Sequence, residues 1–92
     1  MTTDTADIER TGNEIIGMID GFQCVNNRLP VDLNELGSPF TDRNETYEYR
    51  GYLFYYEPAK DGQYWLTVTL GPDENYSYYS RRKYWIWDYD KN

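Results

Sequence analysis

The side chains that could carry chemistry in this sequence are mostly carboxylates. Sixteen Asp and Glu residues are spread over 92 positions, and two carboxylates at a suitable separation can hydrolyse a glycosidic bond. With so many acids, some pair comes close in any fold, so their number alone indicates no active site. The chain also contains no histidine, the commonest general base and metal ligand in proteins. We therefore predict no catalytic residue, no metal site and no cofactor, and a protein that is not an enzyme.

Two shorter features could also carry chemistry. Cys24 is the single cysteine, so it can form neither an internal disulfide nor a zinc site. It lies in an apolar stretch, which predicts a buried and unreactive thiol. Segment 73–75 could touch a calcium ion through its Asp, Glu and Asn oxygens, but it lacks the alternating pattern of a dedicated calcium loop. We interpret it as a polar turn.

The charge of the chain is negative and unevenly distributed. Residues 1–46 hold nine acids and three bases, a net charge of -6, whereas residues 47–92 hold seven acids and six bases, a net charge of -1. The one basic run, at 81–83, is too short to neutralise a phosphate backbone, which argues against nucleic-acid binding. An acidic surface favours a basic protein as partner, with solubility alone as the alternative. No apolar run is long enough for a membrane span.

The elements that must position these side chains begin with a helix. We predict it over 6–27, after a disordered or added tail at 1–5. The apolar stripe of this helix, at spacings of 7, 4 and 3 residues, consists of Ile8, Ile15, Ile19 and Phe22, widened by Ile16, Met18 and Val25. Three glycines interrupt the helix, at Gly12, Gly17 and Gly21. Each costs ~1 kcal/mol against alanine, so packing must hold the helix, and the glycines could admit a sheet at close range.

A short helix and a loop are predicted over 28–45. Pro30 suits the first turn of a helix, Leu33 and Leu36 share a face, and Gly37 is a good terminator. Residues 38–45 contain turn formers and are predicted to be a loop.

An antiparallel sheet is predicted over 46–90, where the apolar period changes to two. Strands at 47–57 and 63–70 form a hairpin, with Glu57 opposite Gln63. The predicted core face of this hairpin consists of Tyr52, Phe54, Tyr56, Tyr64, Leu66 and Val68. A bulge at Gly51 would bring Tyr47 and Tyr49 to the same face.

A second hairpin is predicted from strands at 76–80 and 84–89, with Ser80 opposite Tyr84. The pattern leaves open whether Ile86 or the pair Trp85 and Trp87 faces the core. The predicted fold class is therefore α+β, a single domain with an N-terminal helix on an antiparallel sheet of about four strands.

Aromatic side chains are too numerous for one buried face. Fifteen of the 17 aromatic residues lie between 47 and 89, and one helix can cover only one side of a small sheet. The remaining rings would form an exposed patch, which is typical of a protein-contact surface. We predict protein-contact residues on that side, with Glu57 and Asp88 at the rim: Leu53, Tyr55, Glu57, Trp65, Tyr79, Trp85, Trp87 and Asp88.

A helix running into segment 27–37 (NRLPVDLNELG) resembles the type IV pilins and the pseudopilins of type II secretion. The Tyr-rich strand at 47–49 and the segment from Tyr64 to Asp73, ending in Leu-Gly-Pro-Asp, are similar to strands and a turn of that family. The resemblance covers roughly residues 8–80. The sequence does not show the apolar N-terminal half of the family's helix or the family's processing motif. Its turn at 37–42 also differs from the turn that the family usually has there. The resemblance implies a long helix on an antiparallel sheet and a location outside the cytoplasm.

Three functions are compatible with these observations. The first is a pilin-like protein-interaction domain, the soluble part of an extracytoplasmic or periplasmic protein. The second is a small acidic immunity or inhibitor protein that blocks a toxin or effector enzyme, with a cytoplasmic location as the alternative. The third is a glycan-binding module, which ranks lower because no matching set of Asn, Asp and Gln side chains can be placed beside the aromatic residues.

Overall fold

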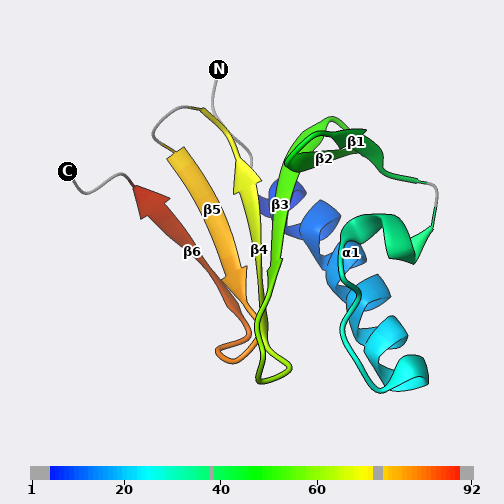
Figure 1. The fold of residues 1–92 in the computed structure, drawn as a ribbon. Helices are drawn as coiled ribbons and strands as arrows, with labels where there is room; N and C mark the ends of the chain where they lie inside the picture. The colour runs from blue at the N-terminus through cyan, green and yellow to red at the C-terminus, as the bar shows by residue number, and fades with distance from the viewer. Residues whose placement is uncertain (1–4, 38, 72–73, 90–92) are drawn as a thin grey trace.

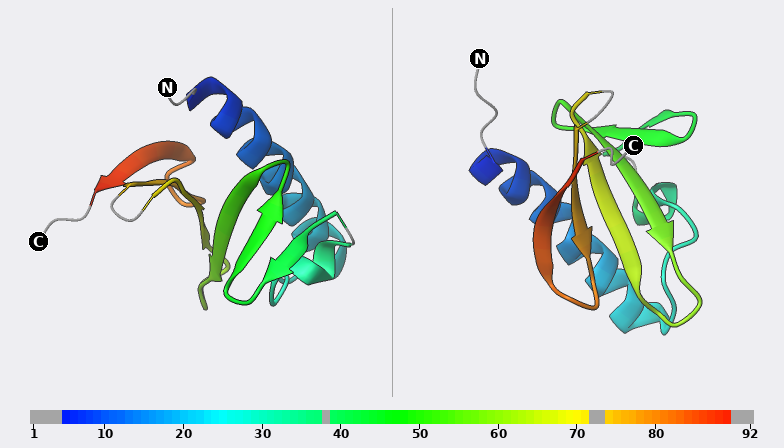
Figure 2. Two further views of the ribbon diagram at one scale, coloured as in Figure 1. Left: turned by 90° about the horizontal axis from the view of Figure 1, so that it is seen from above. Right: turned by 90° about the vertical axis from the view of Figure 1, so that its left-hand side faces the viewer.

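One helix lies against one face of a six-stranded antiparallel sheet (Figures 1 and 2). The computed structural model describes residues 5–37, 39–71 and 74–89, without the side chains of 88 and 89. The strands follow one another in chain order, each paired with the next. The elements are α1 (Thr5–Asn26), η1 (Leu33–Leu36), β1 (Thr41–Arg43), β2 (Thr46–Tyr49), β3 (Tyr52–Pro58), β4 (Tyr64–Thr69), β5 (Glu74–Tyr79) and β6 (Tyr84–Tyr89). The α+β class is confirmed, with six strands in place of about four.

The core lies between α1 and the sheet. Ile8, Ile15 and Ile19 are fully buried on the helix side, and Phe54, Leu66 and Val68 are fully buried on the sheet side. The core face predicted for the first hairpin is therefore the one that the fold uses, and so is the predicted helical stripe from Ile8 to Ile19. Within the described part of the chain, no helix is long and apolar enough to cross a bilayer.

The last turn of α1 differs from the prediction. Cys24 is exposed and Val25 is 82% exposed, so the expectation of a buried thiol was wrong. The Gln23 side chain donates a hydrogen bond to the carbonyl of Gly62, in the turn between β3 and β4. That turn is the end of the sheet, so the residues after Gln23 extend past the surface against which the helix packs.

Close approach of helix and sheet occurs at one glycine of α1. A Cβ on Gly12 would lie 2.4 Å from two ring atoms of Trp85, whereas a Cβ on Gly17 or Gly21 would meet nothing within 4 Å. The Trp85 indole N–H also donates to the side-chain oxygen of Asn13. Gly12 therefore has a packing role, and the other two glycines lie in open space.

The segment predicted as a short helix and a loop contains more structure than expected. Its helix is one 3-10 turn, η1, in which Leu33 is fully buried. The predicted loop at 38–45 contains β1, which pairs with β2 through a turn at Asn44. A strand of three exposed residues, Thr-Asp-Arg, has no apolar alternation, so the sequence pattern gave no signal for it.

Gly51 lies in a tight turn and not in the predicted bulge. Arg50 and Gly51 have φ angles of 52° and 87°, and Tyr49 pairs directly with Tyr52. Two central residues with positive φ are typical of a hairpin turn that matches the twist of its strands. The predicted strand 47–57 is therefore two strands, β2 and β3. Tyr49 is buried and Tyr47 packs against the core, so both lie on the core face that the predicted bulge would have given them.

Both predicted hairpin registers differ from the structure, with different consequences. In the first hairpin Glu57 pairs with Trp65, a shift of two residues that leaves every side chain on its predicted face. In the second hairpin Tyr79 pairs with Tyr84, a shift of one residue. That register places Trp85 and Trp87 toward α1 and Ile86 on the other side, which answers the question left open by the pattern.

Tyrosine hydroxyls join the inner strands β2 to β5 to the acids of α1. Among the described residues there are four such hydroxyl-to-carboxylate hydrogen bonds, from Tyr49 to Glu14, Tyr52 to Asp7, Tyr64 to Asp20 and Tyr76 to Glu9. Burial, followed by the bond to Glu9, raises the pKa of Tyr76 to about 12. The bond from Tyr52 lowers the pKa of Asp7. Much of the negative charge of the N-terminal half therefore faces the edge of the core.

Candidate protein-binding face

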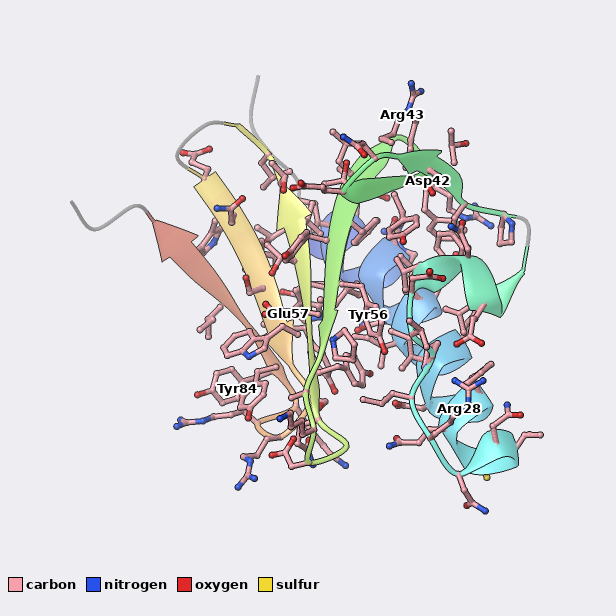
Figure 3. The ribbon with its side chains drawn as sticks, viewed as in Figure 1. Arg28, Asp42, Arg43, Tyr56, Glu57 and Tyr84 are labelled. Carbon is pink, nitrogen blue, oxygen red and sulfur yellow. The ribbon has the colours of Figure 1, made fainter. Side chains whose placement is uncertain are left out.

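The side of the sheet opposite α1 is not covered by any described element. We call it the open face and define it by the outward residues of β3 to β6, namely Leu53, Tyr55, Glu57, Trp65, Tyr79, Tyr84 and Ile86. Tyr55 is 42%, Trp65 37% and Tyr84 48% exposed. Figure 3 shows Tyr84 on the side of the sheet away from α1 and Tyr56 between β3 and the helix. Large apolar side chains gathered on one exposed surface are typical of contact sites.

Stacked rings form the centre of the open face. Trp65 and Tyr79 are cross-strand neighbours, with ring centroids 4.3 Å apart and an angle of 12° between the rings. Next to them Thr67 and Ser77 share a hydrogen bond between their hydroxyls, 3.0 Å between the oxygens, and Ser77 is almost fully buried. Side chains held by stacking and by hydrogen bonds lose little further freedom when a partner binds.

A groove of about 310 Å³ runs along the open face beside β6. Its lining residues are Trp65, Tyr79, Arg82, Tyr84 and Ile86. The guanidinium of Arg82 donates to the hydroxyl of Tyr84 over 3.3 Å, at the end of the groove near the turn between β5 and β6. The groove therefore offers apolar walls and one cationic end.

Charged side chains lie around the open face. Glu57 is exposed and pairs across strands with Trp65. Towards the opposite edge, Arg43 forms an ion pair with Glu48, 2.5 Å between nitrogen and oxygen. The open face thus has an apolar centre and a charged rim, the usual anatomy of a protein interface.

The structure brings together five of the eight predicted contact residues. Leu53, Tyr55, Glu57, Trp65 and Tyr79 share the open face. The placement of Trp85 and Trp87 there was wrong: both rings pack against Tyr76 on the helix side. The side chain of Asp88 is outside the described part of the chain.

Tyr84 and Ile86 are the open-face residues that sequence reasoning missed. Alternation along β6 predicts that Tyr84 and Ile86 share one face of the sheet. Which face that is depends on the register between β5 and β6, and the turn at 80–83 sets this register. Lys83 in that turn has a φ of 62°, and its N–H donates to the carbonyl of Tyr79. A left-handed lysine has no sequence signature comparable to glycine, so the one-residue shift was not predictable.

A polar cavity of about 390 Å³ lies on the helix side, at the end of the sheet. The side chains around it include Asp20, Gln23, Gln63, Tyr64, Tyr78 and Lys83. Several of them bond to one another: Tyr64 donates to Asp20 over 3.1 Å, and Ser80 donates to Gln63 over 2.7 Å. The cavity therefore combines Asp and Gln side chains with aromatic rings, as a glycan-binding site would. The sequence did not predict this combination, because its members come from distant segments of the chain.

Within the described residues, no group of three His, Cys, Asp or Glu side chains could hold a metal ion. Comparisons with protein-family models, with curated proteins and with solved structures found no match. The geometry of the open face is therefore the main guide to function.

Proposed function

We propose that this chain is a non-catalytic protein-interaction domain that binds another protein through the open face. The observation that carries the proposal is the row of half-exposed rings and aliphatic side chains on a sheet covered on one side only. Aromatic side chains with one face in solvent are the residues that most often dominate the binding energy of interfaces.

The breadth of the open face favours a macromolecule over a small ligand. Its apolar members extend from Leu53 on β3 to Ile86 on β6, across four adjacent strands. A small ligand is instead bound in a concave site that surrounds most of its surface. The partner we propose is a protein with an apolar surface of similar width.

The charge of the chain bears on the choice of partner. At a net charge of -7, the molecule attracts basic proteins during encounter, and such attraction mainly raises the association rate. The rim acid Glu57 lies next to the central ring of Trp65. We propose a partner that is basic around its apolar contact surface.

The resemblance to pilins and the inhibitor hypothesis are two versions of this proposal. One helix on an antiparallel sheet agrees with the architecture that the resemblance implies, but unrelated proteins share such arrangements. An immunity or inhibitor protein would use the same open face against a toxin or effector enzyme. In each version the chain itself performs no reaction.

A glycan site is the second candidate function, and the polar cavity favours it. Tyr64 and Tyr78 offer rings there, and Lys83 offers an ammonium group. This cavity lies on the helix side of the sheet. Saccharide binding in the cavity would therefore survive the loss of rings from the open face, whereas protein binding through the open face would not.

The test compares two pairs of alanine variants in affinity capture from the source organism. The Tyr55→Ala and Trp65→Ala double variant removes rings from the open face. The control double variant, Val25→Ala and Val31→Ala, removes two strongly exposed apolar side chains elsewhere. A partner captured by the wild type is identified, purified and titrated against each variant.

We expect the open-face variant to lose affinity by about 30-fold or more, since each of the two rings contributes on the order of 1–2 kcal/mol. The control variant should keep the affinity of the wild type. Sodium chloride should weaken capture of a basic partner. Equal affinity of the two double variants for the captured partner would contradict the proposal.

A further inference from the structure

A row of directly paired side chains crosses the open face, with one residue from each of β3 to β6. Glu57 pairs with Trp65, and Trp65 pairs with Tyr79. Tyr79 in turn pairs with Tyr84. Directly opposite residues of an antiparallel pair point to the same face of the sheet, so these four side chains are neighbours (Figure 3 labels the first and the last). We call them the cross-strand row.

The cross-strand row has opposite charges at its two ends. Glu57 is exposed at the β3 end. At the β6 end, the Arg82 guanidinium donates through Nη1 to the hydroxyl of Tyr84 over 3.3 Å. Arg82 also lines the groove, together with Trp65 and Tyr79. The surface therefore runs from an acid, over three aromatic rings, to a cation.

Arg82 differs from the other arginines of the chain. Each of the other five forms an ion pair with a carboxylate, namely Arg10 with Asp7, Arg28 with Glu35, Arg43 with Glu48, Arg50 with Glu14 and Arg81 with Asp61. Among the described residues Arg82 has no such partner, and Nη1 is the one nitrogen of its guanidinium with a hydrogen bond. Although acids outnumber bases in this chain, a guanidinium beside an apolar groove thus remains available to a carboxylate of another molecule.

A single cation in the groove favours a carboxylate over a phosphate group. Arg81, the neighbour of Arg82, is held by Asp61 over 3.1 Å, and Lys83 lines the polar cavity on the helix side. The basic run at 81–83 therefore contributes one cation to the groove. Phosphate groups carry more charge and are usually bound by clusters of arginines, whereas one guanidinium can bind both oxygens of a carboxylate.

We propose that a segment of the partner crosses the open face along the cross-strand row and places the carboxylate of an Asp or Glu side chain on Arg82. This inference rests on the proposed function and adds the chemistry of the bound segment. Apolar side chains of the segment cover the rings of Trp65 and Tyr79. A Lys or Arg side chain at its other end lies near Glu57. A partner that is basic as a whole therefore carries one acid within its contact surface.

The geometry of the sheet sets the spacing of these groups. Neighbouring strands lie about 4.8 Å apart, so the three spacings from Glu57 to Tyr84 amount to about 14 Å. An extended chain advances about 3.3 Å per residue, so the acid and the base of an extended segment are about four residues apart. The charges also fix the direction of the segment, because the reverse direction would bring like charges together at both ends.

The experiment is the selection of short peptides from a random displayed library on the full chain, in parallel with Arg82→Gln and Arg81→Gln. Arg81→Gln is the matched control, because it removes a neighbouring guanidinium that already has a carboxylate partner. The best wild-type peptide is synthesised in two forms, with its acid or with the corresponding amide, and titrated calorimetrically against each protein. Circular dichroism verifies that each variant is folded.

We expect the wild type and Arg81→Gln to enrich peptides with an Asp or Glu about four residues from a Lys or Arg, with apolar residues between them. Arg82→Gln should lose the preference for the acid and bind the wild-type peptide about tenfold more weakly. The amide form of the peptide should bind the wild type more weakly by a similar factor, and Arg82→Gln should bind both forms equally.

The inference is overturned if the wild type enriches no acid, if Arg82→Gln binds the peptide as tightly as the wild type, or if Arg81→Gln loses as much affinity as Arg82→Gln. Titration of the same peptide against Trp65→Ala separates this failure from that of the proposed function. Peptide binding that needs Trp65 but not Arg82 contradicts the inference alone. Peptide binding that survives the loss of Trp65 contradicts the open face as the binding site.

Discussion

Hydroxyl groups of tyrosine decide much of the packing at the residue scale. Four of them bond to carboxylates of α1, as described above, and Tyr56 donates to the carbonyl of Pro30 over 2.8 Å. Tyr56 and Pro30 are both buried, so that carbonyl has no water to replace the phenol. Tyrosine lets a ring fill the thin core while its hydroxyl satisfies a polar group at the edge.

Neighbouring tyrosines on β3 provide a matched test of this point. Tyr56→Phe leaves the buried Pro30 carbonyl unpaired and should lower the free energy of unfolding by about 1–3 kcal/mol. Tyr55→Phe removes a hydroxyl on the open face and should change the free energy of unfolding by less than about 0.5 kcal/mol. Urea denaturation of both variants measures the difference, and equal stabilities would contradict the role given to Tyr56.

The faces of single residues were largely predictable, and their exposure less so. Strict alternation assigned Phe54, Leu66 and Val68 to the core from sequence alone. Cys24 was misassigned because a helical stripe shows which side is apolar but not where the opposing sheet ends. Exposure at a helix terminus depends on the length of a different element.

At the scale of elements, α1 and β6 are fitted to each other at one position. The Trp85 ring occupies the space that a side chain on Gly12 would need, and it stacks on Tyr76 with 5.3 Å between the ring centroids. Packing here takes precedence over helix propensity. The other helix glycines have no such neighbour, so they weaken the helix without a compensating contact.

Two alanine substitutions in α1 should therefore have opposite effects. Gly17→Ala gains helix propensity in open space and should raise the free energy of unfolding by about 0.5–1 kcal/mol. Gly12→Ala gains the same propensity but displaces the Trp85 ring, and overpacking costs about 1–3 kcal/mol, so a net loss is expected. Thermal denaturation of both variants checks this, and a stabilised Gly12→Ala protein would show that the close contact is absent.

Turn geometry limited the prediction of the strands. The alternation of apolar residues predicted the two long hairpins. Their registers depend on the turns at 59–63 and 80–83, and the alternation does not indicate the conformations of these turns. A shift of two residues was harmless, and a shift of one exchanged Trp85 and Trp87 for Tyr84 and Ile86 on the open face. The predicted residues of β3, β4 and β5 therefore lie together on the open face, whereas Trp85 and Trp87 of β6 lie on the other face.

At the scale of the whole molecule, the described part of the chain has one α-helix for a sheet of six strands. A single α1 can bury only one face, and the aromatic content of the C-terminal half exceeds what that face holds. This imbalance was evident from composition, and the open face is its consequence. The polar cavity was not evident, because its side chains meet only when the end of α1 reaches two distant turns.

The rings of the open face should be accessible in the single molecule. Hydroxyl-radical footprinting of the dilute protein, read by mass spectrometry, tests it by comparing Tyr55 with its neighbour Tyr56. Tyr55 is 42% and Tyr56 8% exposed, so we expect Tyr55 to be oxidised several-fold faster, with Trp65 similarly reactive for its type. Equal and slow oxidation of Tyr55 and Tyr56 would show that both faces of β3 are covered, and would contradict the exposure of the open face.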